Sequence, residues 1–446
     1  MIREMLEARD LVALHDALIG MNPVDVAEQF EKLSETDAVR VFRMLPKDTA
    51  ADVFAELTDD VQQNIIEKFK DAEIANIVGD MFLDDAVDFI EEMPAGLVSR
   101  VLANISVEQR NLINQFLKYP ENSAGSVMTI EYIALKEHLT VSAAFDKIRR
   151  EGIDSETIYT CYVTDARREL IGDVSLKTLL LAQPDAKVGD IMETAVIFAT
   201  TTDDREEIAN EFRKYGLLTM PVVDNEKRIV GIVTVDDVMT IQEEEATEDF
   251  ELMAAMSPSD EPYLKTSVIS LVKNRILWLL LLMLSATVTG SIIGGFEEAL
   301  ATLPILMVFI PMLMDTGGNA GSQSSTLVIR GMALDEITID DTLRVLWKEL
   351  RVSALCGTVL AVVNFIRIFV MNRMETVGET MRLGFSVSIA LFATVVLAKT
   401  VGCMLPLGAK KLKLDPAVMA SPVITTVVDA GALLVYFAIA HALMGI

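Results

Sequence analysis

The C-terminal part of the chain contains five long stretches of mainly apolar residues, and these limit the fold more than any other feature. They cover residues 277–295, 301–329, 352–371, 383–407 and 417–444. A helix needs about 20 apolar residues to cross the ~30 Å hydrocarbon core of a bilayer. Lipid offers the backbone no hydrogen-bond partners, so each stretch should be helical. The sequence therefore predicts an all-α membrane domain of five transmembrane helices within residues 273–446.

Charge divides the chain at about residue 265. Up to that point lie 54 of the 66 acidic residues and 25 of the 38 basic ones, so the front carries a net charge of −29 and the back +1. A field of this sign repels nucleic acid and attracts cations. We therefore expect an acidic water-soluble part joined to a near-neutral membrane part, with the lipid bilayer and cations as partners and no nucleic acid.

The basic residues of the membrane part indicate its orientation. Lys273 and Arg275 precede the first apolar stretch, and lysines and arginines fill the second and fourth connections. Such residues favour the cytoplasmic side, so an odd number of spans leaves the C-terminus on the other side. The first residues lack the apolar core of a signal peptide. We expect a multi-pass protein of the cell (inner) membrane, with its N-terminus cytoplasmic and its C-terminus extracytoplasmic.

Residues 1–122 show a repeating pattern of short helices. Apolar residues at helical spacing alternate with Pro, Ser, Thr and Asp, which favour helix starts. Short helices that cannot bury one face alone stack into an array. We predict an all-α superhelical N-terminal domain that binds or docks and holds no catalytic group.

Residues 123–248 contain an internal repeat of strand, turn, strand and helix. The segment LIGDVSLKTLL aligns with IVGIVTVDDVM, which places Gly172 on Gly231. This pattern resembles an α/β tandem CBS (Bateman) domain, with copies at 126–186 and 187–248. In that family, positions matching Thr234 and Asp237 often hold an adenosine nucleotide such as ATP. A purely structural pair of CBS copies is the alternative.

A dense acidic run leads from the CBS pair toward the membrane, where residues 249–272 are expected to form a connecting helix. Neighbouring acids on one helical face repel each other unless a cation lies between them. A divalent cation such as Mg²⁺ suits carboxylate ligands. A solvated acidic face is the alternative. The acids of this run are Glu243, Glu244, Glu245, Glu248, Asp249 and Glu251.

Polar residues interrupt the second and fifth apolar stretches. Asp429 lies near the middle of the fifth, and an acid at that depth costs at least ~2.5–3.5 kcal/mol on insertion scales. It therefore indicates an ion path, or else an ion pair with Lys399 or Arg367. The prolines and the Gly/Asn/Ser cluster of the second stretch predict broken backbone that lines a watery cavity. Close helix packing through small residues is the alternative, which explains the glycines but not Asp315 and Asn319. Candidate pore ligands are Asp429, Thr425, Asn319 and Asp315.

The order of domains and two membrane motifs, PMLMDTGGNAGSQSS from Pro311 and DPAVMASPVITTVVDAGA from Asp415, resemble the MgtE family of magnesium channels and transporters. The resemblance implies a homodimer whose second and fifth spans line a pore, with Asp429 as its Mg²⁺-binding acid. It also implies that the acidic helix is a plug held by Mg²⁺. The implied sensing acids are Asp84, Asp88, Glu206, Asp237, Glu245, Glu248 and Asp249. The sequence departs from the described pattern at Arg213, Gly216 and Thr240.

The resemblance predicts a Mg²⁺-selective channel or transporter for uptake, closed by intracellular Mg²⁺ bound between the acidic domains and the plug helix. The alternative is a CBS-regulated transporter of other divalent cations, Mn²⁺ or Co²⁺, gated by adenine nucleotide. An enzyme is not expected, because His15, His138 and His441 lie far apart and no hydrolase or zinc-protease motif is present.

Overall fold

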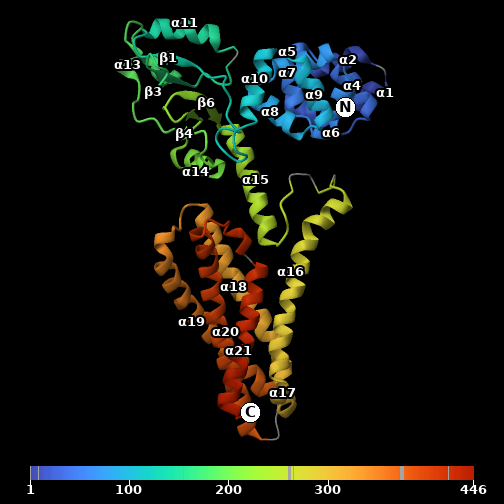
Figure 1. Ribbon diagram of the computed structural model, residues 1–446, viewed down its shortest axis with the longest axis vertical. Coiled ribbons are helices and arrows are strands. Elements are labelled where there is room, and N and C mark those ends of the chain that lie inside the picture. Colours follow the sequence, from blue (N-terminus) through green and yellow to red (C-terminus); the bar gives the residue numbers. More distant parts are fainter. Residues whose placement is uncertain are drawn as a thin grey trace. The chain divides into compact units, whose positions relative to one another are not determined.

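The structure is a computed structural model and describes residues 2–8, 10–153, 155–259, 263–264, 266–371, 376–419 and 421–445. The chain divides into two compact units, Met1–Gln242 and Glu243–Ile446. Figure 1 labels the helices and strands of both units.

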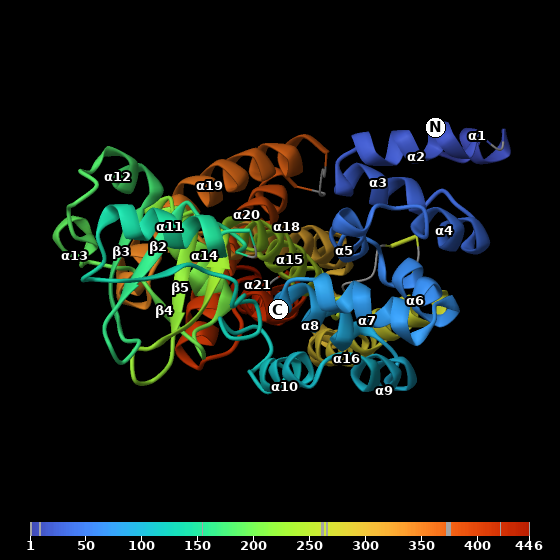
Figure 2. The ribbon, with the colours of Figure 1, turned by 90° about the horizontal axis from the view of Figure 1, so that it is seen from above.

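Short helices open the first unit, as the repeating pattern predicts. The side chains of Ser34 and Ser106 cap two of them, and Pro23 occupies the first turn of a third. Helices two apart in the sequence pack together, α3 on α5 and α5 on α7, which gives a curved array (Figure 2). A helical N-terminal domain is thus confirmed. Its helices are α1 (Ile2–Glu7), α2 (Leu11–Gly20), α3 (Pro23–Phe30), α4 (Glu35–Phe42), α5 (Lys47–Ala55), α6 (Asp59–Lys68), α7 (Asp71–Asp80), α8 (Leu83–Glu92), α9 (Ala95–Asn104) and α10 (Val107–Phe116).

Aromatic rings hold these short helices together. The ring of Phe42 meets those of Phe30, Phe54 and Phe69 edge-on, at centroid distances of 6.2, 5.8 and 5.7 Å. Phe54 in turn meets Phe89 at 5.1 Å. Edge-to-face contacts of this kind add about 0.5–1.5 kcal/mol each beyond the burial of area. These short helices therefore do not have to be stable alone.

The repeat at residues 123–248 folds into two small sheets with the same topology. In each sheet the first strand runs parallel to the second, and the third runs antiparallel to it. The equivalence of Gly172 and Gly231 is confirmed, because they pair with Val163 and Val222 at matching positions. The strands are β1 (Ala134–Lys136), β2 (Thr160–Thr164), β3 (Leu170–Ser175), β4 (Ala199–Thr200), β5 (Thr219–Val223) and β6 (Ile229–Thr234). Helices α11 (Val141–Glu151), α12 (Leu176–Leu181), α13 (Val188–Ile191) and α14 (Arg205–Tyr215) accompany them.

The two copies are buried differently. The first copy has a core of its own, which includes Leu135, Val163 and Val174. The second copy shares one continuous core with the N-terminal helices, and residues such as Met220 and Val222 belong to it. The N-terminal domain is therefore anchored to the second copy by apolar packing within the first unit.

The acidic helix α15 (Val235–Met253) starts earlier than predicted, directly after β6, and crosses the boundary between the units. It ends in a cap where Ala255 adopts φ 53° and the N–H of Met256 donates to the carbonyl of Glu251. Pro258 follows, and a proline at this point prevents continuation of the helix. The segment 249–272 thus holds the end of α15 and the start of the next helix rather than one helix.

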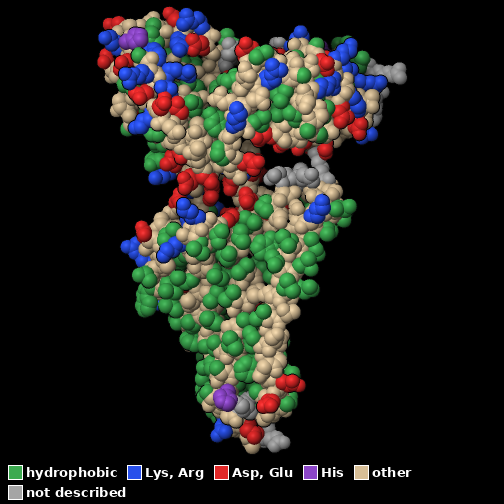
Figure 3. All heavy atoms as spheres, in the orientation of Figure 1, with side chains coloured by type: hydrophobic (Ala, Val, Ile, Leu, Met, Phe, Trp, Pro, Cys, Tyr) green, Lys and Arg blue, Asp and Glu red, His purple; other side chains and the backbone are tan. Residues whose placement is uncertain are grey.

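Long helices form the rest of the second unit. They are α16 (Val268–Gly295), α17 (Glu297–Thr302), η1 (Pro304–Phe309), α18 (Ile310–Ala333), η2 (Ile339–Asp341), α19 (Thr342–Met371), α20 (Val377–Lys411), η3 (Ala417–Met419) and α21 (Ser421–Met444). On the face shown in Figure 3, apolar side chains cover the sides of this unit, and charged ones gather at its ends.

Four segments of the described residues are long and apolar enough to cross a membrane: Val268–Gly295, Ile339–Met371, Val377–Lys411 and Ala417–Met444. They coincide with four of the five predicted spans. The other predicted span, 301–329, corresponds to η1 and α18, where the glycines and polar residues of the GGNAGSQSS cluster lower the hydropathy. A helical membrane region is confirmed, and the count of five spans stays a prediction.

Helix α20 lies at the centre of the second unit and packs against α18, α19 and α21. Gly402 allows the closest approach, because a Cβ there would overlap the carbonyl oxygen of Gly321 on α18. Two aromatic rings fit into glycine notches between α19 and α20: Phe392 against Gly357, and Phe365 against Gly384. Helix α16 contacts α21 but, among the described residues, has no fully buried side chain.

Candidate functional site

Helix α18 carries a polar face in an otherwise apolar unit. Asp315 and Asn319 are exposed, and the side-chain amide of Asn319 donates to Asp315 Oδ1 at 3.2 Å. Gln323 is exposed one turn later. Residues four apart share one face of a helix, so these three side chains form a single polar strip. The structure therefore brings two of the predicted pore ligands into contact.

Helix α21 supplies the other two predicted pore ligands. Thr425 and Thr426 donate to the Pro422 carbonyl at 2.9 and 3.0 Å, a back-bonding that often bends helices. Asp429 follows one turn after Thr425 and is partly buried. Thr425 packs against Gly318, since a Cβ at Gly318 would lie 2.9 Å from Thr425 Cγ2. Helices α18 and α21 thus pack together next to their polar residues.

The two cations considered as partners for Asp429 have other contacts. Lys399 Nζ donates to Ser324 Oγ at 3.3 Å. Arg367 Nη2 contacts Asn364 Oδ1 at 2.9 Å and Met312 Sδ at 3.0 Å. The structure therefore does not favour the ion-pair alternative for Asp429.

In the first unit, Asp84 and Asp237 belong to a cluster of acids contributed by α8, α15 and the loop before β2. Asp84 Oδ1 is buried without a hydrogen-bond partner among the described residues. Desolvation, followed by the charges of Asp85 and Asp237, raises the pKa of Asp84 well above its usual range. The same causes, burial before neighbouring charge, raise the pKa of Asp85 to about 6 and of Glu156 to about 7. The cluster consists of Asp84, Asp85, Glu156, Asp236 and Asp237.

The five-acid cluster could be neutralised by a cation, but its carboxylates are not arranged as a metal site. Among the described residues, no three carboxylates surround a point closely enough to hold a metal ion. Crowded carboxylates with raised pKa values gain from any cation that neutralises them. A hydrated Mg²⁺ needs few direct ligands, since it keeps several of its waters.

The nucleotide-type residues lie at the start of α15. Thr234 Oγ1 donates to Asp237 Oδ2 at 2.5 Å. Burial raises the pKa of Asp237, and this hydrogen bond opposes the rise. Asp237 is thus shared between the predicted nucleotide pair and the five-acid cluster.

Two predicted sensing acids lie on exposed helix surfaces. Asp88 lies one turn after Asp84 on α8, and Glu206 lies in the first turn of α14, where its backbone N–H donates to Asp204. At the other end of α14, Gly216 has φ 64° and caps the helix, and Arg213 donates to Asn210 at 2.8 Å. Two of the three positions that depart from the expected pattern thus have local structural roles, and the third, Thr240, is exposed on α15.

The end of α15 forms a second group of acids, within the second unit. Burial and the charge of Asp415, followed by Glu245 and Glu248, raise the pKa of Asp249 to about 6, and Arg330 opposes the rise. Just beyond, Leu252 and Met253 pack against a cluster on α18 and α20 that includes Met332 and Leu407. The predicted acids of this helix thus come close to Asp415, at the start of the fifth span.

Comparison with known proteins identifies the family. Models for "Divalent cation transporter", "MgtE intracellular N domain" and "CBS domain" match residues 310–439, 21–122, and 124–185 with 188–244. The magnesium transporter MgtE of Bacillus subtilis (strain 168) is 33% identical over 438 residues, which cover 97% of this chain and 94% of that protein. The chain belongs to the MgtE family. MgtE of Thermus thermophilus is 36% identical over 362 residues, 81% of this chain and 79% of that protein.

Two solved structures from magnesium transport proteins match about the first half of this chain. The cytosolic domain of the Mg²⁺ channel MgtE in complex with ATP has a TM-score of 0.51 and 33% identity, and covers 54% of this chain and 98% of that one. The soluble part of a magnesium transporter has a TM-score of 0.52 and 27% identity, and covers 55% and 96%. The family transports ions and does not consist of enzymes.

Sequence reasoning missed four acids of this MgtE protein as site residues. Asp85 and Asp236 are neighbours of predicted acids, so adjacency was the available signal. Asp415 was recognised as the start of a motif but not as a partner of Asp249. Glu156 has no local signal, because it comes from a loop distant in sequence from α8 and α15.

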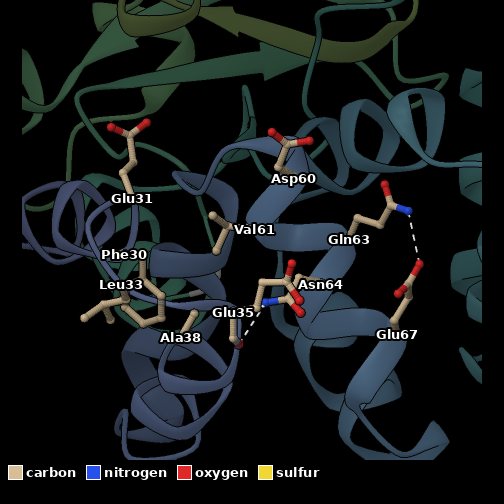
Figure 4. A pocket seen from close by; sticks show the side chains of 10 residues that line it. All are labelled: Phe30, Glu31, Leu33, Glu35, Ala38, Asp60, Val61, Gln63, Asn64 and Glu67. Carbon is tan, nitrogen blue, oxygen red and sulfur yellow. Dashed lines mark hydrogen bonds between the residues drawn. The ribbon is translucent and has the colours of Figure 1, made fainter. Parts of the chain in front are cut away.

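A groove in the N-terminal domain lies apart from all predicted ligands. Apolar side chains such as Phe30 and Val61 form its floor between α3, α4 and α6, and acids stand at its rim (Figure 4). One rim acid, Glu35, pairs with Lys68 at 3.2 Å, and the Glu35 carbonyl accepts from Asn64 at 3.0 Å. This groove holds none of the residues predicted to sense cations.

Proposed function

We propose that this protein mediates uptake of Mg²⁺ across the cell's inner membrane, along a path lined by α18 and α21. The observation that carries the proposal is the close packing of α18 on α21 at Gly318 and Thr425, next to the polar residues of both helices. Asp315 and Asn319 are those of α18, and Thr425 and Asp429 are those of α21. The names of its relatives support the choice of ion.

The chemistry of Mg²⁺ explains why few ligands suffice. Mg²⁺ demands octahedral oxygen coordination and loses its waters reluctantly. In a two-fold homodimer each pore residue occurs twice around the axis. Two Asp429 carboxylates facing one hydrated ion would balance its charge while the waters stay bound. The amide of Asn319 and the hydroxyl of Thr425 would accept or donate hydrogen bonds to those waters.

The two groups of acids would control whether the ion path is open or closed. When intracellular Mg²⁺ is scarce, the acids of the five-acid cluster and those around Asp249 repel one another, and this repulsion adds to burial in raising their pKa values. Bound Mg²⁺ would neutralise both groups and stabilise the arrangement that brings the acids together. An ion that binds one state better shifts the population toward that state. We assign closure to the Mg²⁺-bound state, with α15 as the plug and the N-terminus in the cytoplasm.

The test is Mg²⁺ flux in proteoliposomes that contain Asp429→Ala. We expect flux to fall to the level of empty vesicles, while the variant elutes like the parent in detergent. Asp340→Ala removes an exposed acid of η2, before the predicted span 352–371, and serves as the matched control. Undiminished flux through Asp429→Ala would remove the assignment of the ion path.

The second candidate function is transport of Mn²⁺ or Co²⁺ gated by adenine nucleotide. The Thr234–Asp237 pair and the ATP complex of a relative's cytosolic domain favour it. Calorimetry with ATP should then show binding that weakens about tenfold in Asp237→Ala. The same vesicles would show a higher flux of Mn²⁺ than of Mg²⁺ that depends on ATP, and absence of heat with the parent protein would contradict this function.

A further inference from the structure

A chain of polar contacts crosses three helices of the membrane unit. Lys399 Nζ on α20 donates to Ser324 Oγ on α18 at 3.3 Å, and Ser324 Oγ donates to Glu349 Oε2 on α19 at 2.6 Å. Lys399 is 6% exposed and Ser324 1%. A buried cation in a membrane helix is costly, and such residues usually have a role and a partner. Here the serine hydroxyl links the lysine to a carboxylate of opposite charge.

The hydroxyl can satisfy both neighbours in one orientation. A serine has one O–H donor and two acceptor lone pairs. Its donor is used by the carboxylate of Glu349, so Lys399 must be the donor to the serine oxygen. Loss of Ser324 or Glu349 leaves the buried charge of Lys399 without its full set of partners, which is strongly destabilising, and loss of Lys399 leaves the half-buried carboxylate of Glu349 without its cation. The three side chains therefore depend on one another.

The position of Ser324 on α18 relates these three side chains to the ion path. A helix turns about 100° per residue, so Asp315 lies about 180° and Asn319 about 140° around the axis from Ser324. The anchored side of the helix is thus opposite its polar strip. Helix α18 packs closely on α20 and α21 through small residues such as Gly317 and Gly321, and the hydrogen bonds of Ser324 add a directional restraint to this packing.

We propose that Lys399, Ser324 and Glu349 are positioning residues that lock the rotation of α18 and so aim its polar strip at the ion path. A second contact, from Arg367 of α19 to Met312 near the start of α18, supports the lock at the other end of the helix. The proposal rests on the proposed function in one respect, namely that the polar strip of α18 faces water.

The first experiment tests the lock without any reference to transport. Lys399→Glu and Glu349→Lys are made singly and together in the full chain, and thermal unfolding is followed in detergent. Each single change should lower Tm by at least about 5 °C, because it places like charges on Ser324. The double variant restores opposite charges and should regain at least half of the loss. A double variant as unstable as the sum of the singles would overturn the lock.

The second experiment reads the rotation of α18. Asn319→Cys is made with Cys356→Ser, which removes the exposed native cysteine, and a charged, membrane-impermeant thiol reagent probes position 319 in vesicles. Adding Ser324→Ala should slow modification at least about tenfold. Ser325→Ala is the matched control, because the neighbouring Ser325 hydroxyl is equally buried and has no hydrogen-bond partner among the described residues. Its effect should stay below about twofold.

The outcomes separate the two proposals. Equal rates for the Ser324→Ala and Ser325→Ala proteins would refute the control of rotation. If the thiol introduced at position 319 is not modified in the otherwise unaltered protein, the water-lined path is refuted, and with it the proposed function. The Tm cycle would still decide whether the lock exists. Slow modification with Ser324→Ala alone, together with rescue by charge exchange, supports the proposal.

Discussion

Replacing Glu156 by glutamine should stabilise the first unit, and the effect should depend on pH. Burial, followed by the charges of Asp236, Asp237 and Asp85, raises the pKa of Glu156 from 4.5 to about 7. At ~1.36 kcal/mol per pKa unit, this shift corresponds to ~3.4 kcal/mol. The carboxylate is partly exposed, so screening by solvent reduces the penalty to roughly 1–2 kcal/mol.

The sign of the effect follows from proton binding. Between the unfolded pKa near 4.5 and the folded pKa near 7, the folded state holds more protons, so stability falls as pH rises. The penalty is fully present above about pH 7. We expect Glu156→Gln to raise the free energy of unfolding by roughly 1–2 kcal/mol at pH 8, and by about half of that at pH 5.

Urea unfolding of residues 1–242 in chelator measures this difference, since relatives' cytosolic parts have been crystallised separately. Glu207→Gln removes an exposed acid on α14 and provides the control. Mg²⁺ should stabilise the parent at pH 8 more than it stabilises Glu156→Gln, because the variant has less repulsion to relieve. An equal gain in the free energy of unfolding at pH 5 and pH 8, or the same gain in Glu207→Gln, would refute the ionised Glu156 carboxylate as the source of the penalty.

Further predictions concern the membrane unit and its control. Gly402→Ala should cost about 1–3 kcal/mol of stability, because its Cβ meets the Gly321 carbonyl. Gly408→Ala should not lower stability, because the space around Gly408 is open. Melting curves in detergent compare the two variants. Asp415→Asn removes the charge that acts on Asp249, so closing the path should require at least about fivefold more Mg²⁺ on the cytosolic side. Flux titration measures this, and an unchanged midpoint would exclude Asp415 from the sensor.

Local patterns predicted much of the fold because they depend on neighbours in the sequence. Turn residues at regular intervals indicated the short N-terminal helices, and the alignment of Gly172 with Gly231 indicated the matching strand registers. The start and the internal structure of the second span were harder to predict. Its apolar start folds as η1, and Pro311 lies in the first turn of α18. The predicted break at the Gly/Asn/Ser cluster is wrong, because α18 continues through it and its glycines pack against α20 and α21.

The candidate site could be predicted only where its residues lie on one helix. Asp315 and Asn319 lie four residues apart, so their shared face follows from helical geometry. The five-acid cluster could not be derived in that way, because Glu156, Asp85 and Asp236 come together through the packing of the N-terminal helices on the CBS pair. The Lys399–Ser324–Glu349 contact likewise depends on the packing of three helices.

The glycine notches of α19 and α20 have a mechanical consequence. Phe392 enters α19 at Gly357, and Phe365 enters α20 at Gly384, so each helix holds a ring of the other. Sliding one helix along the other by less than a turn would drive both rings into backbone. We therefore expect the α19–α20 hairpin to behave as a stiff wall that resists shear. Movement that widens or narrows the ion path would then fall to the glycine- and threonine-lined contact of α18 with α21.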